Sequence, residues 1–151
     1  NRLTEEDVFG ELPPEPNKEE NDATLAGIDA NQNGIRDDVE LAIYFKYQES
    51  AKQAAPAFQY AKALQMEFTH VYNSATLVAV IQEEGRGFGC IFDSFEAQNL
   101  KERNSDSAEV EAYIDGLVFN TSQRQKWRED IREKYMVSYG LPNGEDCDLS
   151  L

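Results

Sequence analysis

Apolar residues recur at steps of three and four along most of the chain, which is the spacing of one face of an α-helix. The clearest series runs Ala57, Ala61, Leu64, Phe68 and Val71. It predicts an amphipathic helix over about 56–71, with Pro56 at a break or in the first turn, where proline is tolerated. No stretch alternates apolar and polar residues with period two for long enough to predict a strand.

Shorter apolar series of the same spacing predict further helices on both sides. One runs from Asp37 through Tyr47, and the others lie at about 77–81, 91–100, 110–118 and 122–138. Three glycines, Gly85, Gly87 and Gly89, indicate either a helix break or a close contact between helices. Residues 104–107 predict a polar turn with Asp106 as a helix cap. The fold is therefore predicted to be mainly α, a small bundle of about five helices.

The N-terminal stretch differs in composition from the rest. Residues 1–22 are polar and acidic and contain Pro13, Pro14 and Pro16, so they predict a flexible acidic leader. Residues 23–151 are long enough for one helical domain with a core of its own. The chain begins at Asn1 rather than Met, and we expect a mature or trimmed chain.

One segment between the leader and the first long helix has the spacing of a calcium-binding loop. Residues 29–40 read Asp-Ala-Asn-Gln-Asn-Gly-Ile-Arg-Asp-Asp-Val-Glu and fit D-x-[DN]-x-[DN]-G-x5-E at every specified position. Calcium prefers six to eight oxygen ligands, and Gly34 permits the sharp turn that such a loop requires. The predicted ligands are the side chains of Asp29, Asn31, Asn33, Asp37 and Glu40 and the backbone carbonyl of Ile35.

A second interpretation needs no metal. The same residues could form a turn rich in asparagine and glycine, followed by the acidic first turn of a helix. Carboxylates are favourable at that position because the helix dipole is positive there. The spacing of the six ligand positions favours calcium over this alternative.

The loop resembles those of the EF-hand family, and more closely the variants in dockerins and other exported bacterial proteins. The string from Gly27 to Glu40 is also similar to one in uncharacterised secreted or lipid-anchored proteins of proteobacteria. The resemblance implies a bound Ca²⁺ and an exported location, which could be periplasmic, lipid-anchored or secreted. It departs from the family in having too short a helix before the loop, no second loop and Arg36 at the eighth position, where an aliphatic residue is usual.

Charge and cysteine content limit the function further. The net charge is −15, which disfavours binding to nucleic acid or to an anionic membrane surface. No apolar run is long enough for a membrane span. Cys90 and Cys147 are the only cysteines, and Cys147 lies in an acidic segment unsuited to a buried free thiol. A Cys90–Cys147 disulfide, and with it an oxidising compartment, is therefore favoured over two free thiols.

Residues for catalysis are few. His70 is the only histidine, so a second Glu-x-x-His motif to match Glu67–His70 is missing. Acidic pairs such as Glu83–Glu84 lie in polar runs and are expected to be solvated. The sequence thus favours a non-catalytic, exported, calcium-binding helical domain that interacts with a protein partner or the cell envelope. The alternative is a calcium-dependent hydrolase of the cell envelope.

Overall fold

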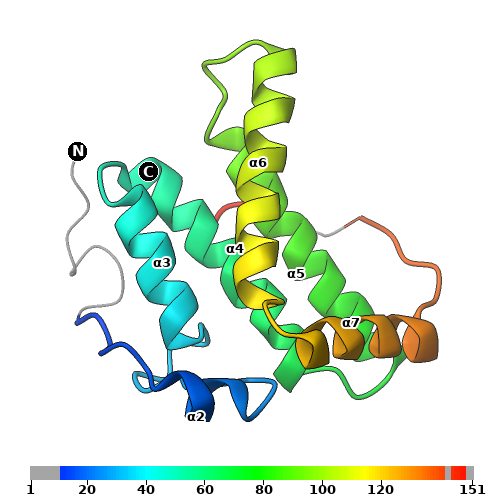
Figure 1. Cartoon of the computed structure of the whole chain (residues 1–151). Helices are drawn as coiled ribbons and strands as arrows, with labels where there is room; N and C mark the ends of the chain where they lie inside the picture. Colours follow the sequence, from blue (N-terminus) through cyan, green and yellow to red (C-terminus); the bar gives the residue numbers. More distant parts are fainter. Residues whose placement is uncertain (1–10, 142–143, 149–151) are drawn as a thin grey trace.

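The computed structural model describes residues 11–141 and 144–148, and within these residues the chain is a helical bundle without strands. The first ten residues of the expected leader lie outside the described residues. Six helices follow in order: α2 Lys18–Asp22, α3 Asp37–Tyr47, α4 Ala51–Thr69, α5 Ser74–Asp93, α6 Leu100–Val118 and α7 Ser122–Tyr135. The predicted fold class is confirmed (Figure 1).

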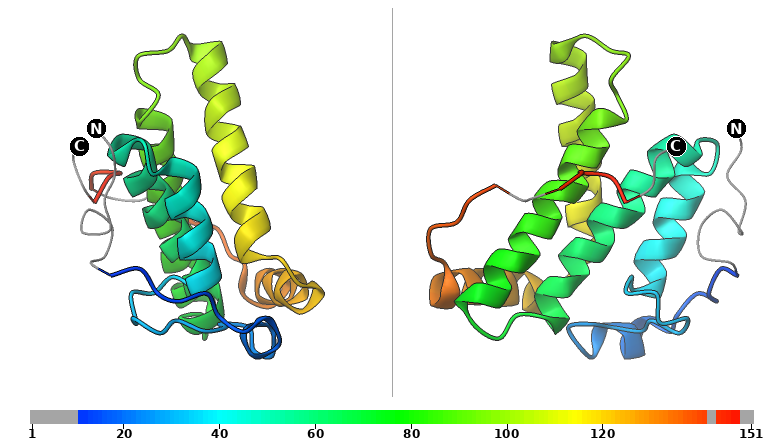
Figure 2. Two further views of the ribbon diagram at one scale, coloured as in Figure 1. Left: turned by 60° about the vertical axis from the view of Figure 1, so that its left-hand side comes forward. Right: turned by 180° about the vertical axis from the view of Figure 1, so that it is seen from behind.

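Helices α3 to α6 pack around the main core, while α7 lies across one end of the bundle (Figures 1 and 2). The core side chains come from the loop residue Ile35 and from one face of each of α3, α4, α5 and α6. They include Val39, Ile43, Ala57, Ala61, Leu64, Ile91, Ile114 and Val118, all at most 1% exposed. A smaller cluster of Val71, Leu77, Val80 and Ile131 attaches α7 to the bundle.

Each long helix after α3 begins at a polar residue whose side chain accepts a hydrogen bond from the first turn. The caps are Ser50, Asn73, Asn99 and Thr121. Such caps satisfy backbone N–H groups that have no partner inside the helix. Because Ser50 caps α4, the helix begins at Ala51 and Pro56 lies inside it. The predicted break or first turn at Pro56 is therefore wrong.

The glycines of α5 do not break the helix, which runs without interruption from Ser74 to Asp93. They allow close packing instead: a Cβ on Gly87 would lie 2.9 Å from the Cα of Tyr60 on α4. Of the two interpretations of these glycines, the close helix contact is correct at Gly87.

Three predicted boundaries are also wrong. The helix predicted over 91–100 is replaced by the end of α5 and a turn before Leu100. Residues 104–107 lie within α6, whose cap is Asn99 rather than Asp106. The last helix ends at Tyr135 rather than at residue 138. The error at residues 104–107 arose because polar residues on an exposed helix face resemble a turn in sequence.

The Cys90–Cys147 disulfide is present and joins α5 to the C-terminal tail, with a Cα–Cα distance of 4.9 Å. The tail is also held by side chains of α4 and α5. Gln59 donates to the carbonyl of Asp146 at 2.6 Å, and Arg86 donates to the carbonyl of Glu145 at 2.9 Å. The disulfide closes a loop of 57 residues, for which loop entropy gives about 4 kcal/mol. None of the described helices is long and apolar enough to cross a membrane.

The end of the expected leader is attached to the domain. Residues 18–22 form α2, capped by Asn17, and Asn21 is 4% exposed. Its side-chain oxygen accepts a hydrogen bond from the backbone of Ile28 at 2.9 Å. Since Pro13 is also buried, part of this acidic segment packs on the helices.

Candidate functional site

The backbone of the predicted calcium loop is tightly turned around Asp29. One carboxylate oxygen of Asp29 accepts from the backbone N–H of Asn33 at 3.2 Å, and the other accepts from that of Gly34 at 2.8 Å. Gly34 has a φ of 88° and Gln32 a φ of 55°, both in the left-handed region that glycine adopts most easily. The template glycine therefore lies where the loop needs it.

Three side chains that were predicted as ligands converge at the inner side of the loop. The amide of Asn33 donates to the Glu40 carboxylate at 2.6 Å, and the amide of Asn31 donates to it at 3.3 Å. Glu40 lies on the first turns of α3 and is fully buried. The loop and the helix after it thus bring Asn31, Asn33 and Glu40 together although nine residues separate the first from the last.

Asp37 closes the loop from the other side. Its backbone N–H donates to the carbonyl of Ile28 at 2.8 Å, and its carboxylate accepts from the N–H of Ala30 at 3.1 Å. The side chain is 1% exposed. Ile35, whose carbonyl is a predicted ligand, is anchored by a fully buried side chain in the core. All six predicted residues therefore belong to one closed turn.

The main electrostatic feature of the loop is a pair of buried carboxylates that have no positive partner among the described residues. Burial raises the pKa of Glu40, although the two asparagine amides oppose this shift. Burial likewise raises the pKa of Asp37, and Asp29 adds repulsion. In the described part of the chain, no ion pair reaches either carboxylate. Buried charges are normally paired or bound to a metal.

The residues fit a hard cation only with a change in the asparagines. Calcium takes oxygen ligands, whereas Asn31 and Asn33 now direct their NH₂ groups toward Glu40. A half-turn of each amide would present the oxygen instead, and for Asn33 it would break the bond from the N–H of Ile35. Among the described residues, no group of three His, Cys, Asp or Glu side chains forms a metal site by itself. The site would therefore depend on amide and backbone oxygens.

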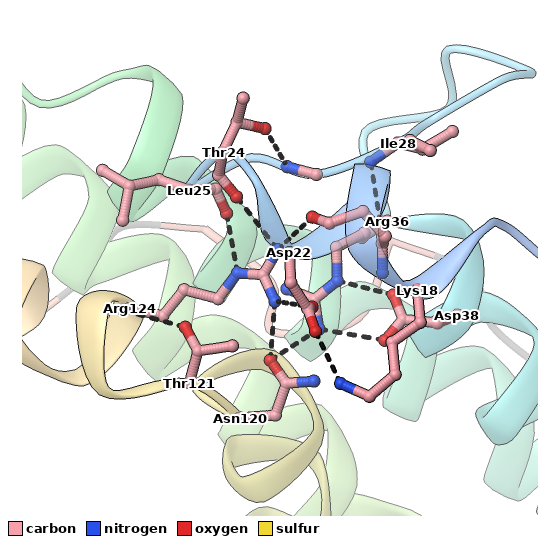
Figure 3. A network of polar contacts seen from close by, with 12 residues as sticks. Lys18, Asp22, Thr24, Leu25, Ile28, Arg36, Asp38, Asn120, Thr121 and Arg124 are labelled. Carbon is pink, nitrogen blue, oxygen red and sulfur yellow. Dashed lines mark hydrogen bonds and ion pairs between the residues drawn. The ribbon is translucent and has the colours of Figure 1, made fainter.

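Two buried arginines, Arg36 and Arg124, connect the loop region to the ends of α6 and α7 (Figure 3). Arg36, the residue at the eighth loop position, is fully buried and forms an ion pair with Asp38. Its guanidinium also donates to the carbonyls of Leu117 at 2.7 Å and Val118 at 3.1 Å. These carbonyls end α6, where cations are favourable because the helix dipole is negative. Arg36 therefore ties the loop to the end of α6.

Arg124, in the first turn of α7, is 1% exposed and makes five hydrogen bonds or ion pairs (Figure 3). It donates to the carbonyls of Asn21, Thr24 and Leu25 and to the side chains of Asp22 and Asn120. Asn120 also accepts from Arg36 at 3.3 Å. The segment before the loop, the loop itself and the α6–α7 corner are thus joined by two guanidinium groups.

The sequence did not predict this pair. The unusual residue at the eighth loop position was a signal that Arg36 has a special role, but the carbonyls that it binds are more than 80 residues away. Thr121 caps α7, because its side chain accepts a hydrogen bond from the backbone N–H of Arg124.

A groove of about 520 Å³ lies beside the loop, between it and α4. Its lining includes Asp29, Lys62, Gln65 and His70. His70 is exposed at the end of α4, and its ring nitrogen is 2.6 Å from the hydroxyl of Thr69. The sole histidine therefore shares a groove with the first predicted ligand.

A second group of acids lies where α7 packs on α4 and α5, and it corrects one expectation. Glu84 was expected to be solvated, but it is 7% exposed. Glu67 is fully buried and forms ion pairs with Arg132 at 2.8 Å and with Arg128 at 3.3 Å. Burial, together with a hydrogen bond and repulsion from Glu67, holds the pKa of Glu84 well above its usual range. The ion pairs of Arg128 and Arg132 with these acids attach α7 to α4 and α5.

Comparisons with protein families, curated proteins and solved structures find no match to this chain.

Proposed function

We propose that this chain is an exported helical domain stabilised by a structural Ca²⁺ in the loop at residues 29–40, and that it acts by binding rather than by catalysis. The observation that supports the metal best is the buried carboxylate pair of Asp37 and Glu40, which has no positive partner in the described part of the chain. A divalent cation would compensate both charges. The ligands would be the six predicted from the sequence.

The disulfide supports the exported location, because disulfides persist in oxidising compartments. The net charge of −15 supports a protein partner or a positively charged feature of the envelope rather than nucleic acid. With three carboxylates and two amides, we expect weak calcium binding, with a Kd on the order of 10⁻⁵ to 10⁻³ M.

Thermal unfolding in EDTA, in calcium and in magnesium tests the proposal. At a calcium concentration one hundred times the Kd, binding to the folded state adds about 2.7 kcal/mol. For a chain of this size that corresponds to a rise in Tm of about 5–10 °C. Magnesium should produce a much smaller rise, because it demands shorter and more regular coordination.

Two variants assign the ligands. Glu40→Gln should abolish the calcium-dependent rise in Tm. Asp38→Asn, which changes a neighbouring carboxylate that faces Arg36, should keep it. If Glu40→Gln responded to calcium like the unchanged chain, the ligand assignment would be wrong. If the unchanged chain did not respond, residues 29–40 would be a turn that caps α3.

The groove between the loop and His70 favours one second candidate, a calcium-dependent hydrolase of the envelope. A crystal structure with bound calcium separates the two. A coordination position that is open toward His70 supports the enzyme, and a metal closed off by protein oxygens supports the structural role.

A further inference from the structure

An aromatic cavity between α3 and α6, beside the main core, has no role in the calcium proposal. Its volume is about 490 Å³, and α3, α6 and the turn between α5 and α6 line it. Tyr47, Tyr113 and Phe95 form aromatic walls, and Asp106 and Glu109 lie on its rim. The volume is large enough for a small organic molecule.

The two tyrosines form a corner suited to a cation. Their ring centroids are 6.4 Å apart and the ring planes meet at 81°. The ammonium group of Lys46 lies 4.5 Å from the centroid of Tyr113 and 6.0 Å from that of Tyr47. A positive charge over an aromatic face is attracted by the electron-rich ring. The corner therefore already holds an ammonium group, supplied by the chain itself.

Lys46 is a replaceable occupant of this corner. Its side chain is exposed and, within residues 11–141 and 144–148, it forms no ion pair, although Asp106 and Glu109 line the same cavity. A primary ammonium is also strongly hydrated, so it gains little from leaving water. A methylated ammonium has an apolar surface that matches the aromatic walls better.

We propose that this cavity binds a quaternary ammonium compound, such as choline or a choline headgroup. The aromatic corner would hold the methylated cation in place of Lys46. The carboxylates of Asp106 and Glu109 would attract the positive charge. The site shares no residue with the calcium loop, so binding should not require calcium.

Titration followed by ¹H–¹⁵N NMR tests the site, with choline as the probe and sodium chloride at equal ionic strength as the reference. We expect a Kd on the order of millimolar, with the largest shifts in residues of α3 and α6 around the cavity. The neutral isostere 3,3-dimethylbutan-1-ol should bind at least about threefold more weakly, because it lacks the charge. Equal shifts with both compounds, or none with choline, would overturn the proposal.

Variants keep the test independent of folding. Lys46→Ala removes the internal competitor and should strengthen choline binding about two- to fivefold. Lys101→Ala, an exposed lysine at the start of α6, should not change it. Tyr113→Leu should weaken binding at least about threefold. If Lys46→Ala left the affinity unchanged or lowered it, the corner would not be the binding site.

Two sources of the same chemistry can be separated. Sedimentation with phosphatidylcholine vesicles, compared with phosphatidylglycerol vesicles of equal size, tests a lipid headgroup. If the chain binds phosphatidylcholine vesicles, if Lys46→Ala increases this binding and if free choline competes with it, the lipid headgroup is the source. Choline binding in solution without such retention assigns a free quaternary ammonium compound.

Discussion

Replacement of Arg36 by leucine tests whether the guanidinium at the eighth loop position holds the fold together. Arg36→Leu keeps part of the apolar stem of the side chain but removes the guanidinium group and its charge. It leaves the carbonyls of Leu117 and Val118 without their donor and deprives Asp38 of its ion-pair partner. Because the Arg36 side chain is fully buried, solvent would reach the two carbonyls only after local opening.

The magnitude follows from the contacts. Hydrogen bonds to charged groups contribute about 1.5–3 kcal/mol each, and loss of one member of a buried pair costs about 3–5 kcal/mol. Asp38 is 32% exposed and can regain water, and the positive charges of Arg36 and Arg124 repel each other. We therefore expect a loss near the lower end, about 3 kcal/mol of the free energy of unfolding. That corresponds to a fall in Tm of about 6–12 °C.

Urea denaturation in EDTA, followed by far-ultraviolet circular dichroism, measures this loss without any contribution from calcium. Lys101→Leu serves as the control, because it removes a positive charge from the exposed surface of α6 and should change stability by less than about 0.5 kcal/mol. A loss below about 1 kcal/mol for Arg36→Leu would refute the reasoning. It would mean that the cost of burying the guanidinium cancels its bonds.

Two further predictions concern the loop and the helix contacts. Burial raises the folded-state pKa values of Glu40 and Asp37, so in EDTA stability should fall as pH rises above about 4 toward those values. Saturating calcium should reverse that slope. In EDTA, Glu40→Gln should make stability depend less on pH. Identical slopes for Glu40→Gln and the unchanged chain in EDTA would contradict this expectation, because all other acids are common to both. Gly87→Ala should destabilise the fold by about 1–3 kcal/mol because its Cβ would meet the Tyr60 backbone. Gly116→Ala should stabilise α6 by up to about 1 kcal/mol, because no described atom beyond the surrounding helix backbone and the two chain neighbours lies within 4 Å of the added carbon. Equal effects of the two substitutions in thermal unfolding would show that the α4–α5 contact is not tight.

The helical class was predictable because apolar spacing reports directly which residues face a core. The series through Ala61 and Leu64 is buried as expected. The disulfide was predictable because two cysteines allow one pairing. Helix boundaries were less predictable. Ser50 caps α4, which begins five residues before its proline, and α5 tolerates Gly87 because the contact with Tyr60 compensates for poor helix propensity. That compensation depends on a neighbouring helix, which local sequence does not reveal.

The loop likewise combines local structure that its sequence predicts with distant contacts that its sequence does not predict. Its local geometry follows from a short motif: Gly34 turns the chain, and Asp29 binds the backbone that the turn brings close. The hydrogen-bond network of the two buried arginines does not follow from a short motif, because Arg36 and Arg124 bind carbonyls that lie about 80 to 100 residues away. Their types alone suggested exposed, solvated side chains, since arginine is rarely buried without several partners.

These arginines also determine how far an effect on the loop can extend. Arg36, at the eighth loop position, bonds to the end of α6, while Asn120 joins it to Arg124 at the start of α7. The loop is therefore connected to the C-terminal half of the bundle. A change that orders residues 29–40 would restrain α6 and α7 as well, so its stabilisation should be shared by the whole domain.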